Sequence, residues 1–228
     1  MKPYKINIYL GNHYPEWILD QVWFLKRVLM HEKIDLGFSN ELMPDAMNLL
    51  IENFEPPFTE TVFDFCKENQ KKIGVVLTEH IDYIDGNVLF NGISENDPDD
   101  YQPRRLIRLL GLLHLAPVTM GYFTLGEYPE LTGFQNIIND ARVTRLPYPK
   151  IDKSDMLFGA KSEPAFDFSF TGTLTAHREK VLKRLKQYAS LSSESFGDDD
   201  KERASMLQKS RFSLNIPQRD NWQWISPM

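Results

Sequence analysis

The chain has 228 residues, of which 42% are hydrophobic and 25% are charged, and its formal net charge is −6. This composition is typical of one large or two small folded domains, and it excludes disorder over most of the length. A negative balance argues against a nucleic-acid binder, which usually presents a basic face. The only cysteine, Cys66, excludes an intrachain disulfide and is predicted to pack as a small apolar residue, so we expect a reducing, cytoplasmic compartment.

Strand-like and helix-like segments alternate along the first 150 residues. Strands are predicted at 5–10, 34–39, 46–54, 71–81, 118–126 and 141–149, and helices at 16–33, 58–70, 101–115 and 128–140. The clearest strand, 71–81, holds an apolar run from Ile73 to Leu77, which is typical of a strand buried on both faces of a parallel sheet. We therefore predict an α/β fold, with a Rossmann-like domain over residues 1–150.

A segment with polar, Gly and Pro content and no clear period, 151–165, is predicted to be a linker. After it the alternation restarts. The pattern predicts strands at 166–172, 192–197 and 211–217, and helices at 175–189 and 198–210. This restart predicts a second, partial Rossmann-like domain over 166–228.

The junction FTGTLTAHR, residues 170–178, has the parts of a phosphate-binding turn. Gly172 lets a ligand approach the backbone, and Thr173 follows it in the turn. A helix that begins near Thr175 carries a partial positive charge at its first turn. Arg178, one turn into the helix, has a guanidinium that can fork onto phosphate oxygens. An ordinary strand-to-helix turn with a solvated Arg178 explains the same residues, and both interpretations stay open.

Two more groups follow predicted strands of the first domain. His80 stands just after the apolar run of strand 71–81, and Gly11, Asn12 and His13 follow strand 5–10. Ligand sites of open α/β sheets lie at the carboxyl ends of strands, so these residues are candidates for substrate contact, against the alternative of ordinary loop residues. No metal or cofactor is predicted, because HExxH, CxxC, GxGxxG and P-loop motifs are absent from the sequence.

Two ordered motifs in the second domain carry a family resemblance. The first is FDFSFTGTLTAHREKVLKRL and the second is MLQKSRFSLNIP. They resemble the start of the nucleotide-sugar-binding domain of GT-B glycosyltransferases of the CgeB-like or family-1 type. The matching positions are Phe170, Gly172, Arg178, Leu182 and Leu185 in the first motif, and Leu207, Ser210, Arg211, Phe212, Leu214 and Asn215 in the second.

The resemblance implies a metal-independent glycosyltransferase of polysaccharide biosynthesis, which moves a sugar from a nucleotide-sugar donor to a glycan or lipid-linked acceptor. The residues that would bind the donor are Gly172, Thr173, Arg178 and Asn215. In the first domain VVLTEHID resembles the segment that places a histidine near the transferred sugar, so His80 is the predicted catalytic residue. Gly11, Asn12 and His13 would contact substrate.

Donor domains of this family continue through an Arg-rich helix, a Gly turn and an acidic segment, which do not follow here before Met228. The resemblance therefore covers a partial donor domain, truncated or completed by another segment, and the activity of that form is left open. A second hypothesis is a non-catalytic α/β protein-interaction module that shares the fold. Arg104, Arg105 and Arg108 form a basic stripe beside leucines, for which a peripheral membrane contact and a salt-bridged helix face both remain open.

Overall fold

In the computed structural model the chain divides into two compact units, Met1–Pro149 with Pro227–Met228, and Lys150–Ser226. The first unit ends beside the boundary predicted at residue 150. The structure describes residues 5–11, 22, 25–26, 29, 34–51, 54–78, 80–90, 93–94, 103–125, 131, 133–146, 163–172, 174–193 and 205–217. The predicted linker therefore lies outside the described residues, except for 163–165.

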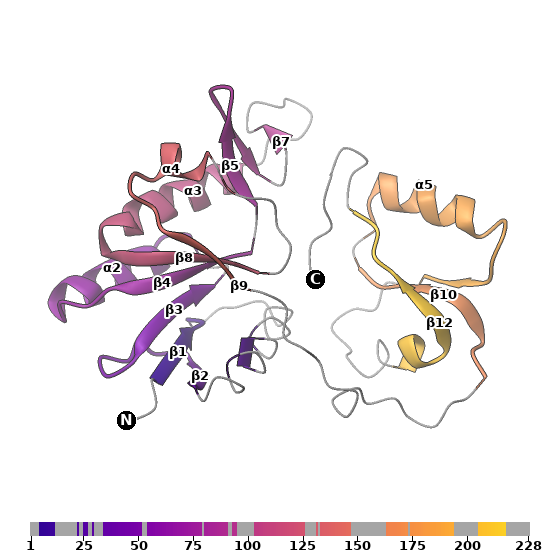
Figure 1. Ribbon diagram of the computed structural model, residues 1–228, viewed down its shortest axis with the longest axis horizontal. Coiled ribbons are helices and arrows are strands. Elements are labelled where there is room, and N and C mark those ends of the chain that lie inside the picture. Colours follow the sequence, from indigo (N-terminus) through magenta and orange to yellow (C-terminus); the bar gives the residue numbers. More distant parts are fainter. Residues whose placement is uncertain are drawn as a thin grey trace. The chain divides into compact units, whose positions relative to one another are not determined.

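The first unit is built on a six-stranded sheet in the order β2-β1-β3-β4-β8-β9 (Figure 1). Its strands are β1 (Lys5–Tyr9), β2 (Asp35–Ser39), β3 (Met47–Ile51), β4 (Ile73–Leu77), β8 (Thr119–Leu125) and β9 (Val143–Leu146). Every pairing in this sheet is parallel, which confirms the predicted Rossmann-like α/β fold. The start of the order, with β1 between β2 and β3, is the flavodoxin-like arrangement, whose winding reverses between β1 and β3.

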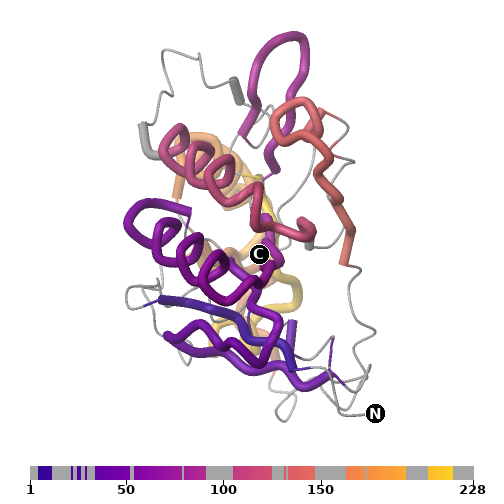
Figure 2. Tube along the Cα trace, turned by 90° about the vertical axis from the view of Figure 1, so that its left-hand side faces the viewer, coloured from indigo at the N-terminus to yellow at the C-terminus, as the bar shows by residue number. Residues whose placement is uncertain are grey.

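Helices cover both faces of this sheet. α2 (Phe58–Glu68) and α3 (Pro103–Leu115) lie side by side over one face, as Figure 2 shows. Because successive strand residues point to opposite faces, Tyr9 belongs to the core under α2 and α3, whereas Ile8 belongs to the core on the other side. The buried residues packed against that other side are Val22 and Leu25, which are helical together with Lys26 and Leu29 in the described part of the predicted helix 16–33.

Cys66 lies in α2 and is 2% exposed, within the core that α2 and α3 share with the sheet. Burial raises the pKa of its thiol, so the thiol stays protonated at neutral pH. The prediction that Cys66 packs as a small apolar residue is confirmed.

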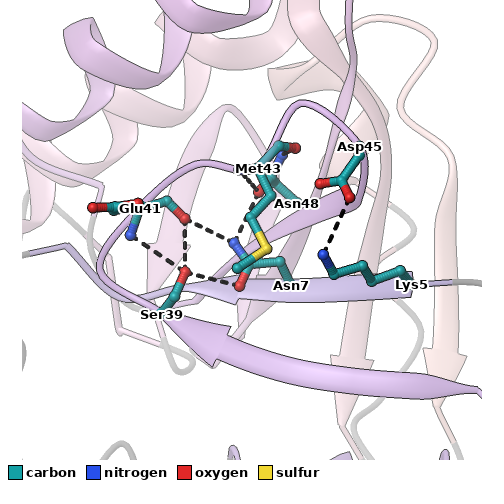
Figure 3. Close-up of polar contacts among 7 residues, drawn as sticks. All are labelled: Lys5, Asn7, Ser39, Glu41, Met43, Asp45 and Asn48. Atoms are coloured by element: carbon teal, nitrogen blue, oxygen red, sulfur yellow. Dashed lines mark hydrogen bonds and ion pairs between the residues drawn. The ribbon is translucent and has the colours of Figure 1, made fainter.

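A buried polar network holds the connection between β2 and β3 (Figure 3). That connection, 40–46, is much shorter than the helical crossover that usually joins parallel strands. The Asn7 amide nitrogen donates to the Glu41 carbonyl at 2.9 Å and to Asn48 Oδ1 at 3.0 Å. Asn48 in turn accepts from the Met43 N–H and donates to the Met43 carbonyl, both at 2.9 Å. Side-chain amides thus hold the loop where a helix would otherwise cover β1.

A small antiparallel sheet that was not predicted follows β4. It consists of β5 (Ile81–Ile84), β6 (Asn87–Phe90) and β7 (Ile93–Ser94), in that order. The turn between its first two strands is Asp85-Gly86, with φ of 51° and 84°. Positive φ at both positions is the type I′ geometry that Asp-Gly favours in hairpins. The segment YIDGNV therefore carries a local sequence signal for a hairpin.

The helix predicted over 128–140 is wrong for most of its described length. Only α4 (Phe134–Ile137) is helical there. The Gly133 N–H donates to Asp82 Oδ1 at 2.7 Å, and a Cβ on Gly133 would lie 2.0 Å from the Tyr83 carbonyl oxygen. This segment is pressed against β5, so a tertiary contact overrides the helical spacing of its apolar residues.

The second unit contains a three-stranded parallel sheet in the order β11-β10-β12. Its elements are β10 (Phe166–Phe170), α5 (Ala176–Leu185), β11 (Leu191–Ser192) and β12 (Ser210–Leu214). Phe170, Leu182 and Ile216 form its buried cluster. The first strand again lies between the second and third, so this sheet repeats the β2-β1-β3 arrangement on a smaller scale. Within the described ranges of both units, no helix has the length and apolar content that crossing a bilayer requires.

Candidate functional site

The carboxyl ends of β10 and β12 meet where the winding of the second unit's sheet reverses. The strands pair in register, with Phe170 opposite Leu214. Gly172 follows the first strand and Asn215 the second, so both predicted residues lie at the same edge. α5 begins at this edge, and Arg178 stands in its first turn. The structure thus brings together three of the four predicted donor residues, while the fourth, Thr173, lies outside the described residues.

Gly172 has a φ of +141°, a backbone conformation that L side chains rarely adopt. A Cβ built at this position would lie 3.5 Å from Nη1 of Arg178 and 3.6 Å from the Phe170 ring. The guanidinium therefore lies beside backbone that carries no side chain. A ligand that reaches this turn can meet the peptide groups and the cation together.

Arg178 is fixed by the protein and is not a solvated surface residue. Its Nε donates to the Ile216 carbonyl at 2.9 Å, and its Cζ lies 5.3 Å from the centroid of the Phe170 ring. Partial burial lowers the pKa of the guanidinium, which nevertheless stays charged at neutral pH because its ordinary pKa is so high. The side chain therefore presents a permanent, oriented positive charge at the edge.

The N-terminus of α5 adds to this potential. Thr175 is the N-cap residue, and its Oγ1 accepts a hydrogen bond from the Arg178 N–H at 3.3 Å. The aligned peptide dipoles place about half a positive charge at such a helix start. An exposed acidic residue, Glu179, also lies in the first turn and partly offsets the positive charges. The arrangement favours an anion that approaches from the Gly172 side.

Ile216 is the member of this site that was not predicted. It anchors Arg178 through its carbonyl oxygen, and its side chain is buried beside Phe170 and Leu182. A backbone carbonyl has no residue-type signal in a sequence. Only the parallel pairing of β10 with β12 brings this carbonyl to α5.

The predicted groups of the first unit stand at two separate strand ends. Gly11 follows β1 with a φ of 70°, while Asn12 and His13 lie outside the described residues. His80 follows β4 as predicted. In the sheet order β3 lies between β1 and β4, so strand pairing does not make the two groups direct neighbours.

His80 is buried, with 3% of its surface exposed. Burial lowers the pKa of its imidazole, and the nearby Asp82 carboxylate acts in the opposite direction. The imidazole is therefore neutral at pH 7, as a general base must be. Asp82 itself has a structural role, because its Oδ1 accepts the N–H groups of Tyr83 at 2.8 Å and Gly133 at 2.7 Å. The catalytic role of His80 stays a prediction.

Acidification is expected to destabilise the first unit through His80. The folded pKa is lowered from the ordinary value of 6.5, so the unfolded chain takes up the proton first as the pH falls. The stability that the neutral, buried ring contributes is thus present above pH 6.5 and is lost below it. Urea unfolding over a pH series measures the slope of the free energy of unfolding against pH. His80→Gln should flatten it while His114→Gln, which changes an exposed histidine, should not; equal slopes in the two variants would contradict the prediction.

No metal centre is found in the part of the chain that the structure describes: it contains no group of three or more His, Cys, Asp or Glu side chains arranged to hold an ion. Among the described residues at the β10–β12 edge, the guanidinium of Arg178 and the start of α5 both contribute positive potential.

Comparisons of the chain with protein-family models, with curated proteins and with solved structures find no match. The resemblance to GT-B glycosyltransferases stays a prediction from the residues of 166–217. A function for the chain is therefore inferred from the geometry of the β10–β12 edge.

Proposed function

We propose that the chain is a metal-independent glycosyltransferase of the GT-B kind, whose second unit holds the diphosphate of a nucleotide-sugar donor. One observation carries the proposal. Gly172 with its positive φ, the start of α5 and the anchored guanidinium of Arg178 lie together at the carboxyl edge of a parallel sheet, where its winding reverses. Ligands of open α/β sheets bind at such edges.

The chemistry of glycosyl transfer fits this arrangement. The bond between the anomeric carbon of the sugar and a diphosphate oxygen breaks, and negative charge develops on the leaving diphosphate. A fixed cation and a helix N-terminus stabilise that charge without reorganising during the reaction. Gly172 leaves room for phosphate oxygens to reach the backbone, and Asn215, exposed after β12, offers an amide to the donor.

The first unit would take the acceptor, a glycan or a lipid-linked sugar. Its carboxyl edge holds the predicted residues Gly11 and His80, and a neutral imidazole can accept the proton of an attacking hydroxyl. We propose that the reaction takes place in the cytoplasm, because a chain with one buried cysteine is typical of reducing compartments.

Arg178→Ala is expected to weaken the binding of nucleoside diphosphates by about tenfold to a hundredfold, the usual effect of losing hydrogen bonds to a charged group. Isothermal titration of the full chain with UDP, GDP, ADP and dTDP measures the change. Arg184→Ala is the matched control, because it removes the same charge from an exposed position in the last turn of α5. It should leave the affinity within about twofold.

Two results would contradict the proposal. The wild-type chain might bind none of the four diphosphates, or the two arginine variants might lose affinity equally. Arg178→Ala also removes the bond to the Ile216 carbonyl, so its thermal unfolding is measured beside the titration. Arg178→Lys separates the effect of the positive charge from that of the guanidinium hydrogen bonds, since it keeps the charge but not the planar guanidinium.

A further inference from the structure

The outward face of α3 is apolar. Four of its large side chains are well exposed: Leu106 at 40%, Ile107 at 42%, Leu110 at 56% and Leu113 at 38%. Positions 106, 110 and 113 form one stripe along a helix, and 107 widens it at one end. These four residues are called the α3 stripe below.

The opposite face of α3 is also apolar. Leu109, Leu112 and Leu115 are buried in the core over the sheet. A helix with apolar residues on both faces is normally covered on both. Among the described residues of its unit, α3 is covered on one face and flanked by α2, so the α3 stripe is a candidate contact surface.

Two arginines of α3, Arg105 and Arg108, do not flank the stripe. Arg105 and Arg108 are half-buried on the inward side, and the Cζ of Arg108 lies 5.7 Å from the centroid of the Phe54 ring, under the helix. The outward side also carries His114, whose ring is 4.6 Å from that of Phe63 in α2. The α3 stripe is therefore uncharged along its length.

The neighbouring surface argues against a membrane as the partner. α2 lies beside α3, as Figure 2 shows. α2 and the turn after it expose three acidic and three basic side chains, which are Glu60, Asp64, Glu68, Lys67, Lys71 and Lys72. Carboxylates and lysines are equal in number on this border, so it offers an anionic lipid surface no net attraction. Membrane-binding helices instead flank their apolar face with Lys and Arg.

We infer that the α3 stripe is the centre of a two-fold interface with a second copy of this chain. An uncharged stripe can pair with itself without like-charge repulsion. It is also nearly symmetric about Leu110, with Leu106 four residues before and Leu113 three residues after. An antiparallel pair of α3 helices related by a two-fold axis at Leu110 therefore sets Leu106 against Leu113 of the partner subunit.

The surroundings of the stripe suit such a pair. α2 and the turn after it expose both signs of charge, with Glu60, Asp64 and Glu68 beside Lys67 and Lys71. Two copies of this border can match acid to base, as the polar rim of a protein interface does. This inference concerns the first unit alone and stands whether or not the second unit binds a nucleotide.

Sedimentation of the full chain over a concentration series tests the interface. We expect the wild-type protein to reach twice its chain mass of 26.6 kDa and Leu110→Glu to stay monomeric. Leu207→Glu, at a position 39% exposed in the second unit, is the matched control and should dimerise as the wild type does. Far-UV circular dichroism spectra should agree among the three proteins and show that all are folded, because both leucines are exposed.

A chemical crosslink between two copies tests whether the two-fold axis lies at Leu110. Leu110→Cys provides an accessible thiol, while the native Cys66 is 2% exposed and does not compete. A short bismaleimide should join two copies of this variant but not of Ile84→Cys, a control at a position 48% exposed on the hairpin. Monomeric wild-type protein at every concentration would overturn the inference. So would a monomer that binds phosphatidylserine vesicles through Leu110.

Discussion

Replacing Gly111 by alanine is expected to destabilise the protein by about 3 kcal/mol or more, the cost of severe overpacking. A Cβ at this position would lie 1.8 Å from the carbonyl oxygen of Phe54 and 2.8 Å from its carbonyl carbon. Neither atom belongs to a side chain that can rotate away, so α3 or the segment after β3 has to move. Alanine favours a helix over glycine by only about 1 kcal/mol, which does not offset this clash.

Urea unfolding of both proteins gives the difference in the free energy of unfolding. Gly37→Ala is the control, because a Cβ at Gly37 in β2 has nothing within 4 Å. Its unfolding free energy should change by less than about 1 kcal/mol. A Gly111→Ala protein as stable as the wild type would mean that α3 does not approach the Phe54 backbone this closely.

Asn48→Ala is expected to destabilise the first unit by about 3 kcal/mol, since it leaves one buried and two partly buried groups without their hydrogen-bond partner. The Asn48 side chain is 1% exposed and is bonded to Asn7 Nδ2, to the Met43 N–H and to the Met43 carbonyl. Alanine replaces none of these bonds. Each buried group that loses its partner costs about 1–3 kcal/mol, and partial entry of water brings the total to the lower end of the sum.

A double-mutant cycle checks this prediction by chemical unfolding. Asn7→Ala combined with Asn48→Ala should cost less than the two single changes added together, because the residues share a hydrogen bond of 3.0 Å. Asp45→Ala is the control. Its ion pair with Lys5 is exposed, so the loss should be within about 1 kcal/mol. Strictly additive single changes would show that the network does not act as a unit.

The elements that could be predicted from the sequence are those with a strong local pattern. A local pattern of about a dozen residues is enough to predict three of them: the buried strand β4, the amphipathic helix α2 and the leucine-rich helix α3. The segment around α4 could not be predicted, because its conformation depends on a long-range contact. Gly133 contacts Tyr83 and also Asp82, which lies 51 residues earlier in the chain. The β5–β6 hairpin could have been predicted from Asp85-Gly86.

The candidate site divides in the same way. Gly172 and Arg178 stand out because a glycine between a strand and a helix, with an arginine one turn on, is a local pattern. The bond from Arg178 to the Ile216 carbonyl joins positions 38 residues apart and depends on how β12 lies against β10. The burial of His80 likewise depends on the strands and helices around it. The sequence therefore predicts that His80 follows a strand, but it does not predict how exposed the side chain is.

The paired amides of Asn7 and Asn48 also have a consequence for how the sheet assembles. The two residues stand opposite each other in the β1–β3 pairing, on the face that carries Tyr9 and Leu50. A slip of one residue between these strands would turn one amide toward the apolar face of Ile8 and Leu49 and leave both without their bonds. Two hydrophobic strands offer many alignments of similar energy. The hydrogen bond between Asn7 and Asn48 forms in the observed alignment only, and it therefore favours this register between β1 and β3.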